Sequence, residues 1–109
     1  MLTFEAIADP TRRQILDLLR EGEIAAGEVA RHFPVSRPAV CKHLRVLRKA
    51  GLVQERRRGR HRLYRLNAAP LAEVGSWLSR YEVFWGERLA VLKRLAEEEE
   101  ARKEQTPHE

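Results

Sequence analysis

Apolar residues recur at intervals of three and four along most of the chain, a pattern that predicts a mainly helical protein. The pattern is best bounded at residues 36–50, where Ser36 is suited to the N-cap and Pro38 to the first turn, and Gly51 follows the last turn. Basic side chains fill most of the other positions. We therefore predict an amphipathic helix of about 15 residues, whose apolar face consists of Val40, Leu44 and Leu47.

Three shorter helices are predicted before this basic helix. The first covers residues 2–8. The second begins at Asp9-Pro10, an N-cap followed by proline at the first helical position, and ends near Gly22, and the third covers residues 24–33. A short helix, a turn and a long basic helix in tandem are typical of the helix-turn-helix. The inward side chains predicted for the second and third helices are Ile15, Leu16, Leu18, Leu19, Ile24, Val29, Ala30 and Phe33.

After Gly51 the pattern changes to that of β-strands. Segments 52–58 and 61–66 flank Gly59, so the sequence predicts a hairpin with an arginine-rich tip. The resulting fold class is mainly α with a small β-hairpin: a winged helix-turn-helix of about five helices plus a two-stranded wing. Basic residues also protect exposed strand edges from pairing with other chains. Two or three would suffice for that, so we favour a wing that contacts nucleic acid.

A long helix is predicted from Pro70 to about residue 96. Its apolar face is broader than one small domain can cover, so we predict that part of it packs against a second copy of the chain. Packing on the first helices of a monomer is the alternative. Residues 97–109 lack apolar periodicity and are predicted to fray as a charged tail beyond a domain of residues 1–96. The apolar positions are Leu71, Val74, Leu78, Tyr81, Trp85, Leu89, Leu92 and Leu95, with Trp77, Phe84 and Val91 beside them.

Positive charge is concentrated in one segment of the chain. The whole chain has 21 Lys and Arg against 16 Asp and Glu, a net charge of +5. Residues 36–66 hold 11 of the basic residues and one acidic residue, Glu55, a balance of +10; the remaining 10 basic and 15 acidic residues give −5 elsewhere. Such a segregated block is the electrostatic footprint expected of a protein that binds double-stranded DNA.

Other features of composition narrow the class of protein. The single Cys41 excludes an intrachain disulfide and a four-cysteine zinc site, which fits a reducing cytoplasm. No apolar run approaches the length of a membrane span, and the N-terminus does not resemble an export signal. A chain of 109 residues can form one domain but not a large pocket with a catalytic apparatus. We therefore expect a cytoplasmic binding protein rather than an enzyme.

The basic helix and the hairpin supply candidate DNA contacts of two kinds. Helix side chains would enter the major groove and read bases, while Ser36 and the helix N-terminus would hold a phosphate. Hairpin arginines would add affinity that does not depend on base sequence. The candidates are Ser36, Arg37, Lys42, His43 and Arg45 in the helix and Arg57, Arg58, Arg60 and Arg62 in the hairpin.

These segments resemble the ArsR family of small bacterial winged-helix transcriptional regulators. The similarity is carried by Ala-Asp-Pro-Thr-Arg at residues 8–12, by the basic helix with Gly-Leu-Val at residues 36–53, and by the hairpin at residues 57–66. The resemblance extends over residues 4 to about 95. It implies a homodimer that binds an imperfect palindrome and usually represses transcription, with the first and last helices at the interface. The interface residues it implies are Phe4, Leu78, Tyr81, Trp85 and Leu89.

The metal-binding sites of that family are not matched in this sequence. Its thiolate sensors carry Cys-x-Cys where this chain has residues 23–29 without cysteine, and the predicted last helix offers Glu73, Glu82 and Glu87 but no histidine. Zinc prefers a tetrahedral set of nitrogen and sulfur ligands. We therefore predict no metal and no cofactor, and a small-molecule effector, if one exists, is unknown.

Three alternative functions share the predicted fold. The first is a metal-responsive sensor repressor, which stoichiometric binding of zinc or arsenite would support. Cys41 lies beside Lys42 and Arg45, which is compatible with a redox-responsive repressor, although the chain has no second cysteine to resolve an oxidised thiol. We favour Cys41 as a small, partly buried residue. A winged-helix protein-interaction module would not need the basic block, and salt-sensitive retention on duplex DNA distinguishes it from a repressor.

Overall fold

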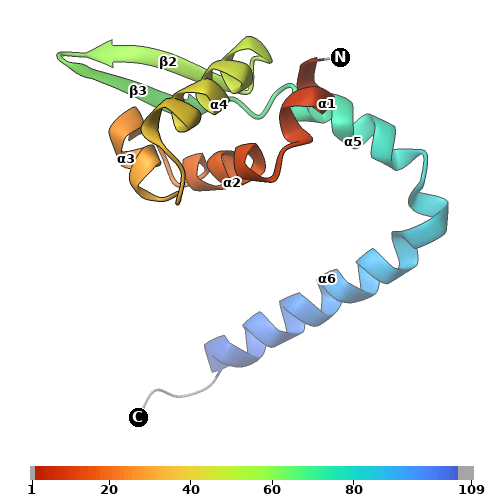
Figure 1. Ribbon diagram of the computed structural model, residues 1–109. Helices are drawn as coiled ribbons and strands as arrows, with labels where there is room; N and C mark the ends of the chain where they lie inside the picture. Colours follow the sequence, from red (N-terminus) through yellow and green to blue (C-terminus); the bar gives the residue numbers. More distant parts are fainter. Residues whose placement is uncertain (1, 106–109) are drawn as a thin grey trace. The chain divides into compact units, whose positions relative to one another are not determined.

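The structure is a computed structural model that describes residues 2–105, apart from the side chains of Leu89 and of residues 103–105. Residues up to Gly75 form one compact unit and those from Ser76 onward a second. The predicted fold class is confirmed, with six helices rather than about five and a small antiparallel sheet in the described chain (Figure 1). The elements are α1 Leu2–Ile7, α2 Pro10–Leu19, β1 Ile24–Ala25, α3 Ala26–Arg31, α4 Arg37–Lys49, β2 Val53–Arg58, β3 His61–Leu66, α5 Leu71–Ser79 and α6 Glu82–Gln105.

The N-termini of α2 and α4 carry the side-chain caps that the sequence predicts. The Asp9 carboxylate accepts a hydrogen bond from the backbone N–H of Arg12 at 2.9 Å, and Ser36 Oγ accepts one from that of Ala39 at 3.2 Å. A proline occupies one of the first two helical positions in each case. The bond from Arg12 also lowers the pKa of Asp9. Both helices therefore begin where local chemistry favours a start.

A Schellman motif ends α4 at Gly51. The Gly51 N–H donates to the Arg48 carbonyl and the Leu52 N–H donates to the Leu47 carbonyl, both at 3.0 Å. Gly51 has φ +78°, a conformation that residues with a Cβ rarely adopt. Leu47 and Leu52 are both buried in the core. Only three residues therefore separate the end of α4 from the start of β2.

Residues 24 and 25 form a strand, so the prediction of a helix from residue 24 is wrong over its first turn. β1 pairs antiparallel with β3, with Ile24 opposite Tyr64 and Ala25 opposite Leu63, and the sheet order is β1-β3-β2. The β-branched Ile24 finds backbone partners about 40 residues later in the chain, which helical periodicity cannot reveal. The predicted two-stranded wing is thus part of a three-stranded sheet.

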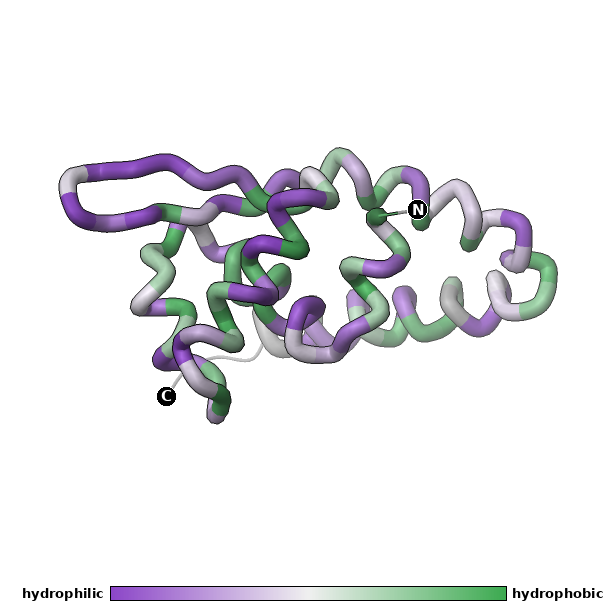
Figure 2. The backbone as a smooth tube through the Cα atoms, turned by 45° about the horizontal axis from the view of Figure 1, so that its top comes forward, coloured by the Kyte–Doolittle hydropathy of each residue, from purple (hydrophilic) through white to green (hydrophobic). Residues whose placement is uncertain are grey.

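The winged unit has one hydrophobic core, formed by α1 to α4 and the sheet. The predicted apolar face of α4 is confirmed, because Val40, Leu44 and Leu47 are each 0% exposed. Figure 2 shows the hairpin as hydrophobic near the helices and hydrophilic along its outer part. The remaining buried apolar residues are Ala6, Ile15, Leu16, Leu19, Val29, Leu52, Val53 and Tyr64, and the predicted Leu18, Ile24, Ala30 and Phe33 pack half-buried against them.

The single helix predicted after Pro70 is wrong, because the chain forms two helices there. Ser79 Oγ donates to the Ser76 carbonyl at 2.7 Å, and the Tyr81 N–H donates to the Leu78 carbonyl at 2.9 Å, three residues back. Such bonds tighten and close a last helical turn. α5 therefore ends at Ser79, and α6 starts at Glu82.

The secondary structure does not change at residue 97, where the sequence predicted a frayed tail. α6 continues to Gln105, with an ion pair between Glu99 and Arg102 at 2.8 Å, three residues apart. Glu, Ala, Arg and Lys favour helix strongly, which explains the extension. Residues 106–109 of the predicted tail lie outside the described residues, and the division at residue 96 stays a prediction.

Candidate nucleic-acid interface

α4 places its apolar side chains in the core and its cations in solvent. Lys42, Arg45 and Lys49 are exposed and follow one another at spacings of three and four, so they share one side of the helix. Arg37 is also exposed, and its Nη2 lies 3.4 Å from the position that a Cβ on Gly27 would take. The bare backbone of α3 at Gly27 therefore leaves room for the Arg37 guanidinium.

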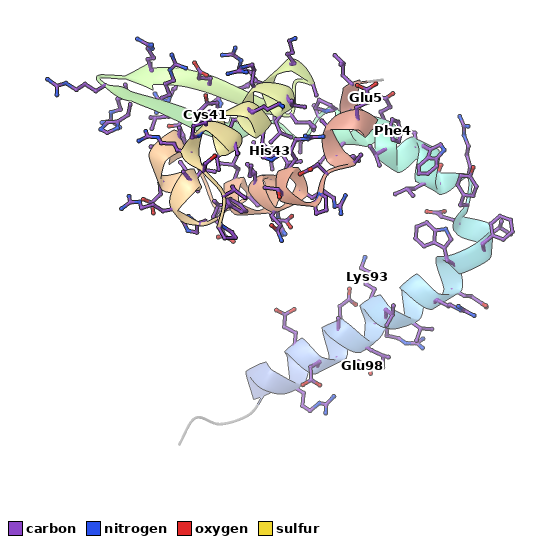
Figure 3. The ribbon with its side chains drawn as sticks, in the orientation of Figure 1. Phe4, Glu5, Cys41, His43, Lys93 and Glu98 are labelled. Carbon is purple, nitrogen blue, oxygen red and sulfur yellow. The ribbon has the colours of Figure 1, made fainter. Side chains whose placement is uncertain are left out.

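The wing places like charges opposite one another. Arg57 is the cross-strand neighbour of Arg62. Like charges in such positions destabilise a sheet, and residues 56–62 contain no Asp or Glu to offset them. Gly59, with φ +61°, closes the hairpin. Side chains project from both of its strands (Figure 3), so the wing is suited to an anionic partner.

Hydrogen bonds divide the basic residues of α4 and the wing into two groups. Arg56 donates from Nε and Nη2 to the two carboxylate oxygens of Glu23, at 2.8 and 2.6 Å, which lowers the pKa of Glu23. Arg48 donates to Glu55 at 3.0 Å. In the second group, side chains form no hydrogen bond or ion pair with any residue that the structure describes: Arg37, Lys42, Arg45, Lys49, Arg57, Arg58, Arg60 and Arg62.

A hollow of about 820 Å³ lies between α3, the N-terminal half of α4 and the wing. Its lining includes Arg37, Arg60 and Arg62. Cys41, labelled on α4 in Figure 3, is exposed and lines this hollow, so the expectation that it is partly buried is wrong. α4 and the wing thus contribute cations to one concave surface, and the sign of their charge suits an anionic partner such as a DNA backbone.

Comparison with known proteins shows the family of the chain. Residues 9–55 match the family described as "Bacterial regulatory protein, arsR family". The transcriptional repressor SdpR of Bacillus subtilis is 43% identical over 69% of this chain and 83% of that repressor, and the regulator Rv2034 of Mycobacterium tuberculosis is 44% identical over 88% and 87%. A crystal structure of a possible transcriptional regulator for arsenical resistance superposes with a TM-score of 0.68 and 42% identity, covering 80% of this chain and 91% of that one. The chain belongs to the arsR family.

Members of this family regulate transcription, and the chain is a DNA-binding transcriptional repressor, not an enzyme. Winged helix-turn-helix proteins place a helix in the major groove, so the cationic surface of α4 and the wing is the candidate DNA-binding surface. The resemblance inferred from the sequence is confirmed at the level of the family. Within the described residues, no helix combines the length and apolar content needed to cross a bilayer.

One predicted DNA contact, His43, does not lie among the exposed cations of this arsR-family protein. His43, labelled in Figure 3, is half-buried, and its Nδ1 lies 3.4 Å from Arg12 Nη1 of α2. Arg12 also donates from Nε to the Ala6 carbonyl at 2.6 Å and from Nη2 to the Glu5 carbonyl at 2.9 Å. Arg12 thus connects the last turn of α1 to α4, and a base contact by His43 stays a prediction.

The base of the wing is joined to α4 through Glu55. One carboxylate oxygen, Oε2, accepts the Tyr64 hydroxyl at 2.7 Å and Arg48 Nη1 at 3.0 Å. The Tyr64 hydrogen bond, followed by the charges of Arg48 and Arg62, lowers the pKa of Glu55 against the opposing effect of partial burial. Burial and the bond to Glu55 raise the pKa of Tyr64 to about 12.

Two features of this surface were missed from the sequence. Lys49 belongs with Lys42 and Arg45, and its spacing in the helix was a sufficient signal. The Glu55 network had no such signal, because Arg48 and Glu55 lie on different elements. Within the described residues, no three His, Cys, Asp or Glu side chains come together as a metal site.

The residues predicted at the dimer interface lie in both units, each described by itself. Phe4 of α1 is half-buried in the winged unit. In the second unit, Leu78 and Tyr81 are exposed and Trp85 is half-buried, whereas the side chain of Leu89 is outside the described part of the structure. Trp77 packs edge-on to Tyr81 at a centroid separation of 5.4 Å.

Proposed function

We propose that this repressor acts as a homodimer that binds a palindromic operator and is not regulated by metal ions. Two copies present their α4 helices to successive major grooves about 34 Å apart, and each wing lies along the adjacent backbone. Binding near a promoter blocks polymerase in the bacterial cytoplasm. The observation that carries the proposal is the group of eight exposed cations that have no hydrogen-bond or ion-pair partner among the described residues.

The cations divide into base-reading and backbone-binding sets. Arg37, Lys42 and Arg45 lie on the helix expected in the major groove, where arginine and lysine pair with guanine O6 and N7. Ser36 and the first turn of α4 hold a phosphate, since unpaired backbone N–H groups at a helix N-terminus attract anions. The wing residues contribute affinity without sequence preference: Arg57, Arg58, Arg60 and Arg62.

Dimerisation is supported by apolar side chains that the second unit leaves in solvent. Phe84 is 76% exposed and Leu92 61% exposed, and Tyr81 is also exposed. Burial of each such side chain contributes about 1.5–3 kcal/mol, so a second copy of the chain would stabilise this unit. The proposed interface combines Phe4 of α1 with Leu78, Tyr81, Trp85 and Leu89.

Independence from metals is supported by the supply of ligands. The chain has one thiol, Cys41, and the segment that holds α5 and α6 up to Gln105 contains no histidine. The similar protein described as a possible arsenical-resistance regulator makes arsenite the relevant second candidate as effector. One thiolate cannot build the multi-ligand site that a soft metal prefers.

Selection of genomic fragments by the purified full chain, followed by sequencing, tests the proposal. We expect enrichment of fragments that share an imperfect palindrome, with half-sites centred about 10 base pairs apart. Binding to a labelled operator duplex should weaken steeply with salt, because each phosphate contact releases counterions. Random recovery of fragments, or binding of one chain per operator at saturation, would contradict the proposal.

A further inference from the structure

Arg48 lies where a further DNA contact is expected. Cys41, Arg45 and Arg48 follow one another at spacings of four and three, so they lie in one row along α4. Arg48 continues this row beside the wing. Its side chain is 51% exposed. An arginine in such a position ordinarily binds phosphate, because its guanidinium is always charged and matches the geometry of the phosphate oxygens.

Arg48 is held instead by the protein's own carboxylate. Arg48 Nη1 donates to Glu55 Oε2 at 3.0 Å, and the same oxygen accepts the hydroxyl of the buried Tyr64 at 2.7 Å. The Glu55 side chain is only 18% exposed. The carboxylate is therefore anchored to the core and cannot follow Arg48 toward a ligand.

The ion pair contributes little to folding, since pairs with one half-exposed partner add at most about 1 kcal/mol. The ion pair has a measurable effect on DNA binding if it keeps Arg48 from a phosphate. Each phosphate contact changes the slope of log affinity against log salt by about 0.9. We propose that Glu55 is a positioning residue that limits sequence-independent DNA binding by withdrawing Arg48 from the phosphate backbone. This inference rests on the proposed DNA-binding function.

Restraint of this kind is useful to a repressor. A genome offers a vast excess of random sites that compete with one operator, and contacts to phosphate strengthen binding to all of them. An additional free arginine would hold more of the protein on random DNA. Glu55 thus keeps one cation of the basic block out of the non-specific complex.

Titration of full-length variants with a random duplex of fixed length, at several salt concentrations, tests the proposal. Glu55→Gln retains an oxygen that can accept the Tyr64 hydroxyl but removes the negative charge that holds Arg48. We expect a salt slope steeper by about 0.9 and affinity about eightfold higher at 0.1 M salt, if affinity at 1 M is unchanged. The double variant Glu55→Gln with Arg48→Gln should return to the wild-type slope.

Two further variants make the result decisive. Glu21→Gln changes the net charge by the same amount as Glu55→Gln, at an exposed carboxylate that forms no ion pair with the described residues. We expect this control to change the salt slope by less than half as much as Glu55→Gln does. Arg48→Gln alone should leave the salt slope unchanged. This measurement tests the inference even if the Glu55 variant fails to fold. A slope lower by about 0.9 in Arg48→Gln would overturn the inference, because Arg48 would then already contact phosphate.

The outcomes separate this inference from the proposed function. Absence of salt-dependent DNA binding by the wild-type chain would remove both. A wild-type chain that binds its operator, together with an unchanged slope in Glu55→Gln or a steeper slope that persists in the double variant, would overturn only the role of Glu55. Melting curves of each variant establish that the fold is retained.

Discussion

The winged unit and helix α6 differ sharply in how much apolar surface they bury. Eleven apolar residues of α1 to α4 and the sheet are buried together. In α6, by contrast, Val83, Phe84 and Leu92 are 85%, 76% and 61% exposed. The winged unit therefore carries its own core, whereas the proposed dimerisation would bury apolar side chains that the second unit leaves exposed. Under the proposed function, DNA reading and assembly thus belong to parts of the chain with different sources of stability.

Truncation after Gly75 should give the largest effect. We expect a folded winged unit that is monomeric and binds the operator at least about 100-fold more weakly, because linking two DNA-binding units raises affinity by about 10² to 10⁴. Sedimentation and operator titration measure the two losses. Truncation after Ala96 serves as the control and should change both measurements little. A fragment 1–75 that sediments as a dimer would contradict the division of roles.

Leu44→Ala and Leu92→Ala test the same contrast at single residues. Leu44 is 0% exposed, so its truncation should lower the free energy of unfolding by about 2–5 kcal/mol. Leu92 is mostly exposed in one chain, so its truncation should leave the unfolding free energy of the dilute monomer within about 0.5 kcal/mol of wild type while weakening the dimer. Urea denaturation over a range of protein concentrations separates these effects. Equal losses in the two variants at high dilution would be inconsistent with a core confined to the winged unit.

Within the winged unit, α4 and the wing should respond differently to loss of charge. Arg58→Ala with Arg60→Ala should weaken operator and random DNA alike and lower the salt slope by about 1.8, or 0.9 per phosphate contact. Arg37→Ala should relax the preference at one half-site position, at a cost of about 1–3 kcal/mol. Competition against a panel of single-base operator variants distinguishes them. Altered base preference in the wing variant alone would reverse the assignment.

Metal ions should have the smallest effect. We expect operator affinity with a chelator and with a slight excess of zinc, cadmium or arsenite to agree within about threefold, roughly 0.7 kcal/mol. A ligand must bind two conformations unequally to shift their balance, and Cys41 alone offers a weak site. Tenfold release by a metal in the chain truncated after Ala96 would reveal a site within the remaining residues.

Local signals in the sequence predicted the starts and stops of the helices around the DNA-binding surface. Asp9 and Ser36 cap helices through their own side chains, and Gly51 ends α4 through its backbone freedom. Each signal acts within about four residues. The face of α4 also followed directly from spacing, because buried and exposed residues alternate with the helical period.

Features that depend on distant partners were not predictable in the same way. Strand β1 exists because Ile24 meets Tyr64, and Glu23 meets Arg56 33 residues later. His43 was predicted to project from α4 as a DNA contact, but Arg12 of α2 approaches its ring. Spacing assigns a residue to a face of its own helix, whereas the neighbour that covers this face comes from elsewhere in the chain.

The connection between α4 and β2 at Gly51 is only three residues long and is closed by hydrogen bonds. If α4 and the wing both contact one duplex, as proposed, this connection limits how far they can separate along it. A displacement of one base pair, about 3.4 Å along the axis, would then have to move the helix and the wing together. In the proposed dimer, the internal spacing of each half-site would therefore be set by a single chain, and only the separation of the two half-sites would depend on how the copies are joined.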